Sequence, residues 1–249
     1  MQTLSDLSLT LLFDNVCHEA QLPSLWGFSL LVELSGKRLL FDTGSNGRVL
    51  LKNCEMLGVS PIELDFLFIS HGHWDHTGGI DSILELNPDL TLVVPVSLSP
   101  RWIDDLRQQC SKLILVDQEP VTFAPGFSST GVFPGEMPEQ ALVIPSDQGA
   151  VVITGCAHPG IGAIAKEASR QNSQAIALLA GGFHLFKAQE KEIDAVINEL
   201  ANLPVQYIMP THCTGSLASS CLKKQFGVRC IAGGSGQRIR FNSAGQPVL

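Results

Sequence analysis

The stretch that most constrains this chain of 249 residues is FISHGHWDHTGGI, which runs over residues 68–80. It places His71, His73, Asp75 and His76 within six positions, although the whole chain has only seven histidines. An apolar run, LDFLFIS, leads into it and is typical of a fully buried strand. Because imidazole and carboxylate are ordinary zinc ligands, the spacing H-x-H-x-D-H at a strand end predicts a metal site.

Composition and charge narrow the class of protein. Hydrophobic residues make up 45% and charged residues 16% of the chain, which predicts a well-buried core. The net charge of −8 argues against a nucleic-acid partner, since proteins that follow phosphate backbones are usually basic. No apolar run reaches the roughly 18 residues that span a bilayer. The first residues also lack the features of a signal peptide. We therefore expect a cytoplasmic protein that acts on a small molecule, without a membrane partner.

The seven cysteines include no C-x-x-C pair, which predicts reduced thiols and no disulfide framework. Cys156 and Cys213 neighbour candidate ligand histidines in the sequence. Thiolates do bind zinc. We nevertheless interpret both cysteines as packing residues, because the candidate ligand sets do not require them.

The pattern of apolar residues predicts an α/β fold. The segments LSLTLLFDN, WGFSLLVEL and RLLFDTG alternate as strands do, and NGRVLLKNCEMLG then has helical spacing. Strand-like and helix-like segments alternate through the rest of the chain. Each half passes from strands to strand–helix units, which predicts a four-layer αβ/βα sandwich with two mixed sheets face to face and helices outside. Residues 1–249 contain no linker-like segment, so a single domain is expected.

Further candidate residues follow other predicted strands. His158 lies in VVITGCAHPG and His212 in YIMPTHCTG, each just past an apolar run. Functional groups of α/β proteins gather in the loops at the carboxyl ends of strands, so these two histidines are expected to complete the ligand shells. Asp42, in LLFDTG, is expected to orient a histidine ligand, with capping of the next loop as the alternative.

The order FDTG, SHGHWDHTGG, TGCAHPG and PTHC resembles the metallo-β-lactamase superfamily over nearly the whole chain. GFSLLVE, TGCAHPGI, GGFHL and PTHCTG are similar to a narrower group, related to the archaeal dihydropterin ribofuranosyl-aminobenzene phosphate synthase. The resemblance implies the fold predicted above and a pair of cations. It assigns one ligand set to His71, His73 and His158, and the other to Asp75, His76 and His212, with Asp42 behind them.

One position departs from the superfamily pattern. Many relatives carry a bridging aspartate after the strand that here reads AIALLAGG, whereas this chain has Gly181 and Gly182. The bridging carboxylate is therefore missing, and we expect one cation to be labile or the two to be joined only by hydroxide. His184 follows the two glycines. It is interpreted as a ligand, a proton donor or a contact for a substrate anion, with a packing role as the alternative.

The leading functional interpretation is a hydrolase with two divalent cations, zinc first, with iron, manganese or magnesium as alternatives. A metal-activated hydroxide would attack an ester, lactone or phosphoester-type substrate, which includes anionic or phosphorylated compounds. Asp75 and His184 are the candidates for proton transfer, and Asp42 for support. One alternative is a synthase that couples a dihydropterin pyrophosphate to an arylamine ribose phosphate and releases pyrophosphate. Another is a metal-binding sensor without catalysis. The oligomeric state is left open.

Overall fold

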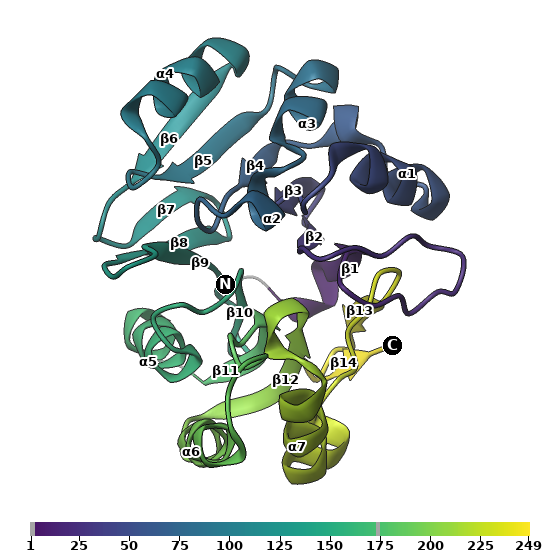
Figure 1. Cartoon of the computed structure of the whole chain (residues 1–249), viewed down its shortest axis with the longest axis vertical. Coiled ribbons are helices and arrows are strands. Elements are labelled where there is room, and N and C mark those ends of the chain that lie inside the picture. The colour runs from purple at the N-terminus through teal and green to yellow at the C-terminus, as the bar shows by residue number, and fades with distance from the viewer. Residues whose placement is uncertain (1–2, 173–174) are drawn as a thin grey trace.

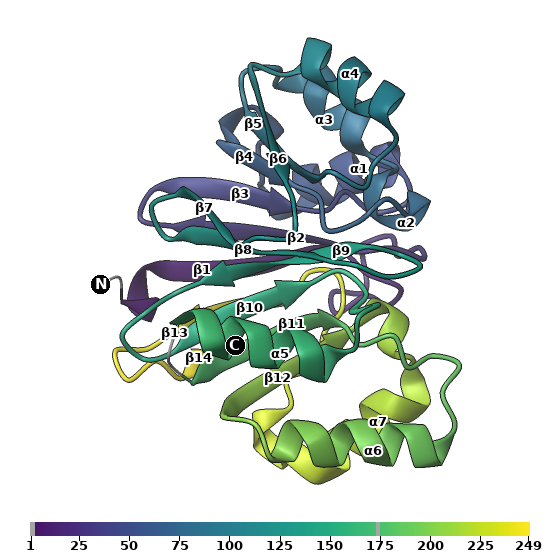
Figure 2. The same cartoon turned by 90° about the vertical axis from the view of Figure 1, so that its left-hand side faces the viewer.

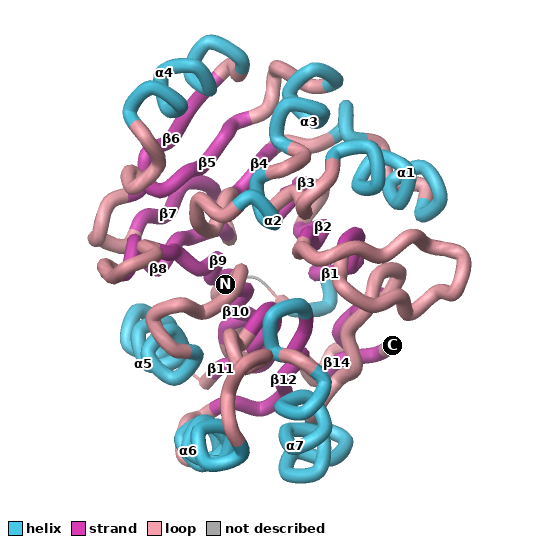
Figure 3. The backbone as a smooth tube through the Cα atoms, viewed as in Figure 1, coloured by secondary structure: helices cyan, strands magenta, loops and turns pink. Residues whose placement is uncertain are grey.

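The computed structural model describes residues 3–172 and 175–249, and these form two β-sheets that lie face to face with helices on the outer sides (Figures 1 and 2). Figure 3 shows the same arrangement, with strands inside and helices at the periphery. The expected four-layer αβ/βα sandwich is therefore confirmed. Among these described residues no helix combines the length and apolar character that a membrane crossing requires.

The first sheet has eight strands among the described residues, in the order β14-β13-β1-β2-β3-β4-β5-β6. Its strands are β1 (Leu7–Phe13), β2 (Ser29–Leu34), β3 (Lys37–Phe41), β4 (Phe66–Phe68), β5 (Thr91–Pro95), β6 (Lys112–Val116), β13 (Arg238–Phe241) and β14 (Pro247–Val248). The second sheet has six in the same described part, in the order β12-β11-β10-β9-β8-β7. Its strands are β7 (Val121–Ala124), β8 (Phe127–Phe133), β9 (Glu139–Ile144), β10 (Ala150–Thr154), β11 (Ile176–Gly182) and β12 (Val205–Thr211).

The helices cover the two outer faces. They are α1 (Gly47–Leu57), α2 (Trp74–Thr77), α3 (Ile80–Leu86), α4 (Pro100–Gln109), α5 (Ile161–Asn172), α6 (Glu190–Ala201) and α7 (Ser216–Phe226). Helix α1 shows how local sequence sets the bounds. The side chain of Asn46 accepts hydrogen bonds from the first-turn N–H groups of Arg48 and Val49, and Gly58 ends the helix with a φ of 71°. Such caps satisfy backbone groups that the helix itself leaves unpaired.

The core between the sheets is apolar and includes Phe28, Phe41, Phe68, Phe127 and Leu142, which are fully buried. Burial of each such side chain stabilises the fold by roughly 1.5–3 kcal/mol. Two further apolar clusters lie between the sheets and their covering helices.

The structure adds three details that the sequence pattern did not supply. The strand β13 near the C-terminus joins the first sheet, where it pairs with β1 through Ser8–Arg240 and Leu9–Ile239. The bend after the first two cluster histidines is a short helix, α2, which local spacing did not reveal. The strand expected over QAIALLAGG starts at Gln174, outside the described residues, and β11 begins at Ile176.

The loops with candidate residues meet at one edge. Strands β3 and β4 are parallel in the first sheet, and β10, β11 and β12 are parallel in the second. Their carboxyl ends therefore point to the same rim, where the two sheets face each other. The end of β1 and the start of the antiparallel β9 reach this rim as well. This topology brings together side chains that are far apart in the chain.

Candidate metal centre

The first predicted ligand set comes together across the two sheets. His71 and His73 follow β4, and His158 follows β10. Nε2 of His71 lies 3.1 Å from Nδ1 of His73, and one ring nitrogen from each of the three residues lies within 4.8 Å of the others. Tetrahedral ligands about 2.0–2.1 Å from a zinc ion lie roughly 3.3 Å apart. The spacing of the closest pair thus suits one cation.

The second set also converges. Asp75 and His76 belong to α2, and His212 follows β12. Nε2 of His76 lies 3.2 Å from Nε2 of His212, and Oδ2 of Asp75 lies 3.2 Å from the same His212 atom. The third separation, from Asp75 to His76, is wider at 3.9 Å. These three donors could therefore hold one cation.

The donor atoms have the chemistry of a cation site. Nε2 of His158 is buried and has no hydrogen-bond partner among the described residues. Burial lowers the pKa of His71 well below its ordinary value and that of His76 to about 3. Neutral imidazoles are the form that ligates a metal. The residues present therefore fit divalent cations.

Asp42 and Ser70 orient two of these histidines. Oδ2 of Asp42 lies 2.6 Å from Nδ1 of His76, so Nε2 of that ring is left facing the centre. Ser70 donates its backbone N–H and its hydroxyl to Asp42, and its Oγ also lies 2.9 Å from Nδ1 of His71. Burial raises the pKa of Asp42 well above its ordinary value, against the hydrogen bonds from Ser70. A carboxyl group therefore supports His76, at the place where the sequence suggested a supporting aspartate.

Glu139 supports His158, and the sequence did not single it out. It opens β9, is fully buried, and accepts at Oε2 from the backbone N–H of His158 at 2.9 Å, with Nδ1 of the same ring 2.8 Å away. Its other oxygen accepts from four donors: Thr154 Oγ1 and the N–H groups of Gly155, Cys156 and Ala157. Burial opposes ionisation of Glu139, but its hydrogen bonds with His158 and the nearby His71 hold the pKa of this carboxyl well below its ordinary value. The sequence feature that could have indicated Glu139 is an acidic residue at the start of an otherwise apolar strand.

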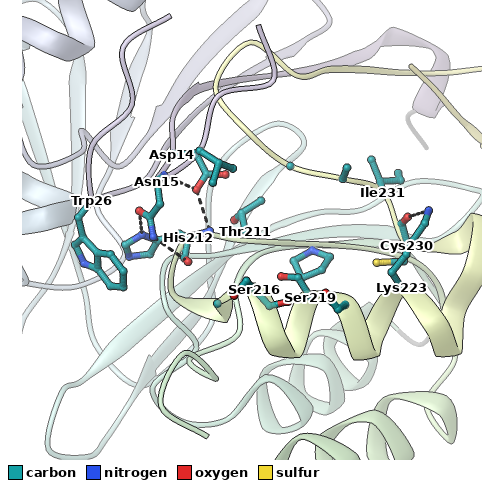
Figure 4. A pocket seen from close by; sticks show the side chains of 16 residues that line it. Asp14, Asn15, Trp26, Thr211, His212, Ser216, Ser219, Lys223, Cys230 and Ile231 are labelled. Atoms are coloured by element: carbon teal, nitrogen blue, oxygen red, sulfur yellow. Dashed lines mark hydrogen bonds between the residues drawn. The ribbon is translucent and has the colours of Figure 1, made fainter. Parts of the chain in front are cut away.

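His212 is held by two residues that follow β1, and neither was expected from the sequence. Asn15 lies with Oδ1 2.9 Å from Nδ1 of His212, and its Nδ2 donates to the His212 carbonyl, as Figure 4 shows. Asp14 accepts the His212 backbone N–H at 3.0 Å. Burial raises the pKa of Asp14 to about 6. Burial opposes protonation of His212, but its hydrogen bond to Asp75 raises the pKa overall.

Residues 27–212 match the family described as the metallo-beta-lactamase superfamily. The chain belongs to the metallo-beta-lactamase superfamily. The resemblance drawn from FDTG, SHGHWDHTGG, TGCAHPG and PTHC is thereby confirmed. The converging histidines lie in the part of the chain that this match covers.

Relatives and solved structures extend the comparison. The chain is 26% identical to the 7,8-dihydropterin-6-methyl-4-(beta-D-ribofuranosyl)-aminobenzene-5'-phosphate synthase of Methanocaldococcus jannaschii, over 87% of this chain and 90% of the synthase. The structure of Tm1679, described as a metal-dependent hydrolase of the beta-lactamase superfamily, superposes with a TM-score of 0.78. That match has 26% identity and covers 95% of this chain and 99% of Tm1679. YhfI from Bacillus subtilis shares the fold, with a TM-score of 0.67 and 17% identity over 93% and 98% of the two chains.

Gly181 and Gly182, where we expected the bridging carboxylate to be missing, leave no room for a side chain in this structure. A Cβ on Gly182 would lie 2.4 Å from Sγ of Cys213, and one on Gly181 would lie 1.9 Å from the Thr154 carbonyl oxygen. Real Cβ atoms do not approach neighbours so closely, so neither position accepts an aspartate without rearrangement. Cys213 occupies the space that a side chain at Gly182 would need.

Cys156 stands among the donors of both sets, which differs from the packing role expected for it. Its Sγ lies 3.3 Å from Nε2 of His76. It also lies within 4.8 Å of donor atoms from His71, His158 and His212 in three separate groupings. Burial raises the pKa of the Cys156 thiol well above its usual range, whereas a bound cation favours the thiolate. A sulfur atom is therefore available among the donors of both sets.

His184 lies at the rim of the centre. Its ring centroid is 4.5 Å from that of His158, and the side chain is exposed. A hydrogen bond with Cys213 raises the pKa of His184 above its ordinary value. Trp26, Trp74 and Phe186 are also partly exposed and line the same cavity, of about 200 Å³, above the histidines. A substrate that enters from this side meets His184 and aromatic rings.

Several residues of the centre have left-handed backbone. The φ angles are 54° at Asp42, 58° at Ala157, 53° at His184 and 46° at His212. This conformation costs about 1–2 kcal/mol per non-glycine residue, and such residues concentrate at functional sites. The hydrogen bonds of Glu139 and Asp14 to the loops around Ala157 and His212 offset this cost.

Proposed function

We propose that this chain is a metal-dependent hydrolase with two divalent cations, preferably zinc, held by His71, His73 and His158 and by Asp75, His76 and His212. The proposal depends on one observation: six side chains from three segments of the chain, after β4, β10 and β12, converge into two sets of donors at one rim of the sandwich. Structural stability alone rarely requires so many buried imidazoles around one point. The proposed substrate is a small molecule with an ester, lactone or phosphoester bond.

A cation bound here would lower the pKa of a coordinated water from about 15.7 to about 7 and so supply hydroxide at neutral pH. The protein's own groups have separate tasks. Asp42, Glu139 and Asn15 would orient the imidazole rings of the ligand histidines. Their contacts with Nδ1 of His76, His158 and His212, respectively, support this role. His184 would donate a proton to the leaving group, since its raised pKa keeps part of it protonated at neutral pH. Asp75, which borders the cavity, is the alternative proton carrier.

Metal removal tests this proposal. Dialysis against a chelator is expected to abolish hydrolysis of at least one substrate in a panel of esters, lactones and phosphodiesters. Zinc is expected to restore it, with close to two equivalents bound per chain. Metal content is measured by mass spectrometry of the protein before and after reconstitution. Bound metal without hydrolysis or any other turnover would favour a sensor instead.

A synthase reaction is the second candidate, favoured by the similarity to the archaeal synthase across most of both chains. In that reaction an arylamine nitrogen attacks the carbon that carries the pyrophosphate, the carbon–oxygen bond breaks and pyrophosphate leaves. Incubation with a dihydropterin pyrophosphate and an arylamine ribose phosphate separates the candidates. The coupled product, detected by mass spectrometry, identifies a synthase. Free hydroxymethyl pterin without coupling identifies hydrolysis.

The position of Cys156 leads to a prediction about its sulfur. With cobalt(II) in place of zinc, the wild type is expected to show the intense near-ultraviolet absorption of sulfur-to-cobalt charge transfer, because Sγ lies among the donors of both sets. Cys156→Ser should remove this band. Cys221→Ser is the control, since that cysteine packs in the α6–α7 region away from the histidines. A band that survives in Cys156→Ser would contradict the role of this sulfur as a ligand.

A further inference from the structure

Two buried cysteines lie side by side at the metal centre. Cys156 follows β10 and Cys213 follows β12, 57 positions later in the chain. Their two Sγ atoms and a ring nitrogen of His212 all lie within 4.8 Å of one another. Sγ of Cys213 is also 3.5 Å from the carbonyl oxygen of Cys156. The proposed hydrolysis gives Cys213 no task, so the purpose of this second thiol is a separate question.

Gly182 keeps the space beside the two cysteines open. A Cβ at this position would lie 2.4 Å from Sγ of Cys213 and 3.2 Å from Cα of Cys156. A side chain there would therefore press against both cysteines. Without it, rotation about the Cα–Cβ bonds can bring the two sulfurs toward the roughly 2.05 Å separation of a disulfide.

The backbone is held in place on both sides of the pair. The N–H group of Cys156 donates to the buried carboxylate of Glu139 at 2.9 Å. The carbonyl of Cys213 accepts from the N–H groups of Leu185 and Phe186, each at 3.0 Å. These anchors keep the two sulfurs within reach of each other, and side-chain rotation is then the motion that joins them.

A small oxidant can reach the pair. Cys156 and Cys213 are only 3% and 1% exposed, but both border the cavity of about 200 Å³ above the histidines. His184 and Trp74 border the same cavity with exposed side chains, so it is open to solvent. Since one water molecule occupies about 30 Å³ in the liquid, hydrogen peroxide fits in a space of this size.

We propose that Cys156 and Cys213 form an oxidative modification site, where a peroxide joins the two thiols in a disulfide and withdraws Cys156 from the metal donors. One sulfur, as thiolate, attacks a peroxide oxygen, the O–O bond breaks, and the released hydroxide takes up a proton to become water. The other thiol attacks the resulting sulfenic acid, the S–S bond forms and a second water leaves. Two thiols are thus oxidised while one peroxide is reduced to two waters.

Mass spectrometry of the full chain tests the proposal. Protein freed of metal by a chelator is treated with hydrogen peroxide, digested without reductant and mapped. We expect a joined pair of peptides that contains Cys156 and Cys213 and that dithiothreitol separates. Sulfinic acids at both cysteines without this pair, or a disulfide between other cysteines in its place, would overturn the proposal.

Bound zinc is expected to slow the reaction severalfold, because a sulfur that ligates a cation is less free to attack the peroxide. The same mapping of zinc-loaded protein at timed intervals measures this effect. Equal rates with and without zinc would contradict the competition between metal and disulfide for Cys156.

Two variants check the assignment. Cys213→Ser should abolish the joined pair and leave Cys156 to oxidise further, to a sulfinic acid. Cys110→Ser is the control, since this half-buried cysteine packs against the outer cluster of the first sheet, and it should form the disulfide as wild type does. Mapping of the wild type needs no variant, so the test stands if a substitution prevents folding.

Only the consequence for catalysis rests on the proposed function: peroxide should lower the rate of hydrolysis and dithiothreitol should restore it. Bond formation is measured without a substrate. A disulfide in a protein that hydrolyses nothing would therefore contradict the proposed function alone. Hydrolysis by a protein that forms no such disulfide would contradict this inference alone.

Discussion

Glu139→Ala is expected to destabilise the folded protein by about 3–5 kcal/mol, because each buried donor left without a partner costs about 1–3 kcal/mol. The glutamate is fully buried and accepts from the hydroxyl of Thr154 and from the backbone N–H groups of Gly155, Cys156, Ala157 and His158. Without it these donors stay buried and unpaired. A whole domain is stable by only about 5–15 kcal/mol, so the loss is large. Urea unfolding followed by circular dichroism measures it.

The conservative variant Glu139→Gln separates the charge from the packing. An amide can keep one oxygen toward the backbone donors, but its NH₂ group would then face Nδ1 of His158. That contact favours a proton on Nε2, the nitrogen that the metal requires bare. Zinc affinity at this site is therefore expected to fall about 10–100-fold.

Glu136→Ala is the matched control for both variants, because this glutamate is exposed and lies three residues before Glu139. It should change neither the free energy of unfolding nor the affinity for zinc. Wild-type unfolding and zinc binding in Glu139→Ala would contradict the supporting role given to Glu139.

His71→Ala is expected to lower the metal content from about two equivalents to one or fewer and to reduce hydrolysis by more than about a hundredfold. Loss of a group that only supports a ligand costs about 10–100-fold, and loss of the ligand itself should cost more. His71 is fully buried and lies 3.1 Å from the donor atom of His73, so no water-exposed side chain can readily replace it. Metal analysis and the rate with the best substrate of the panel provide the two readouts.

His18→Ala is the natural control, since His18 is the exposed histidine outside the centre while the other six lie in it. It should keep the wild-type metal content and rate. If His71→Ala kept them too, the first ligand set and the proposed hydrolysis would both be wrong. Loss of metal with an intact circular dichroism spectrum would show that the ligand was removed and the fold was kept.

The sandwich and the residues at its rim could be predicted from the sequence because both depend on local patterns. Periodicity of apolar residues marks strands and helices, and the carboxyl ends of parallel strands must share an edge. His158 and His212 could therefore be grouped with the cluster at His71 although they are far away in the chain. The pairing of β13 with β1 was not predicted, because the sequence of a short strand does not indicate which sheet it joins.

What the sequence determined by itself was the set of groups able to hold a cation, because H-x-H-x-D-H keeps its donors close whatever the rest of the chain does. Only the tertiary structure decided which other residues orient these groups. Glu139, Asn15 and Asp14 act on histidines 19 to 198 positions away. Cys156 lies among the donors of both ligand sets only because the two sheets face each other. Contacts at such sequence separation depend on packing between layers, and no local pattern encodes them.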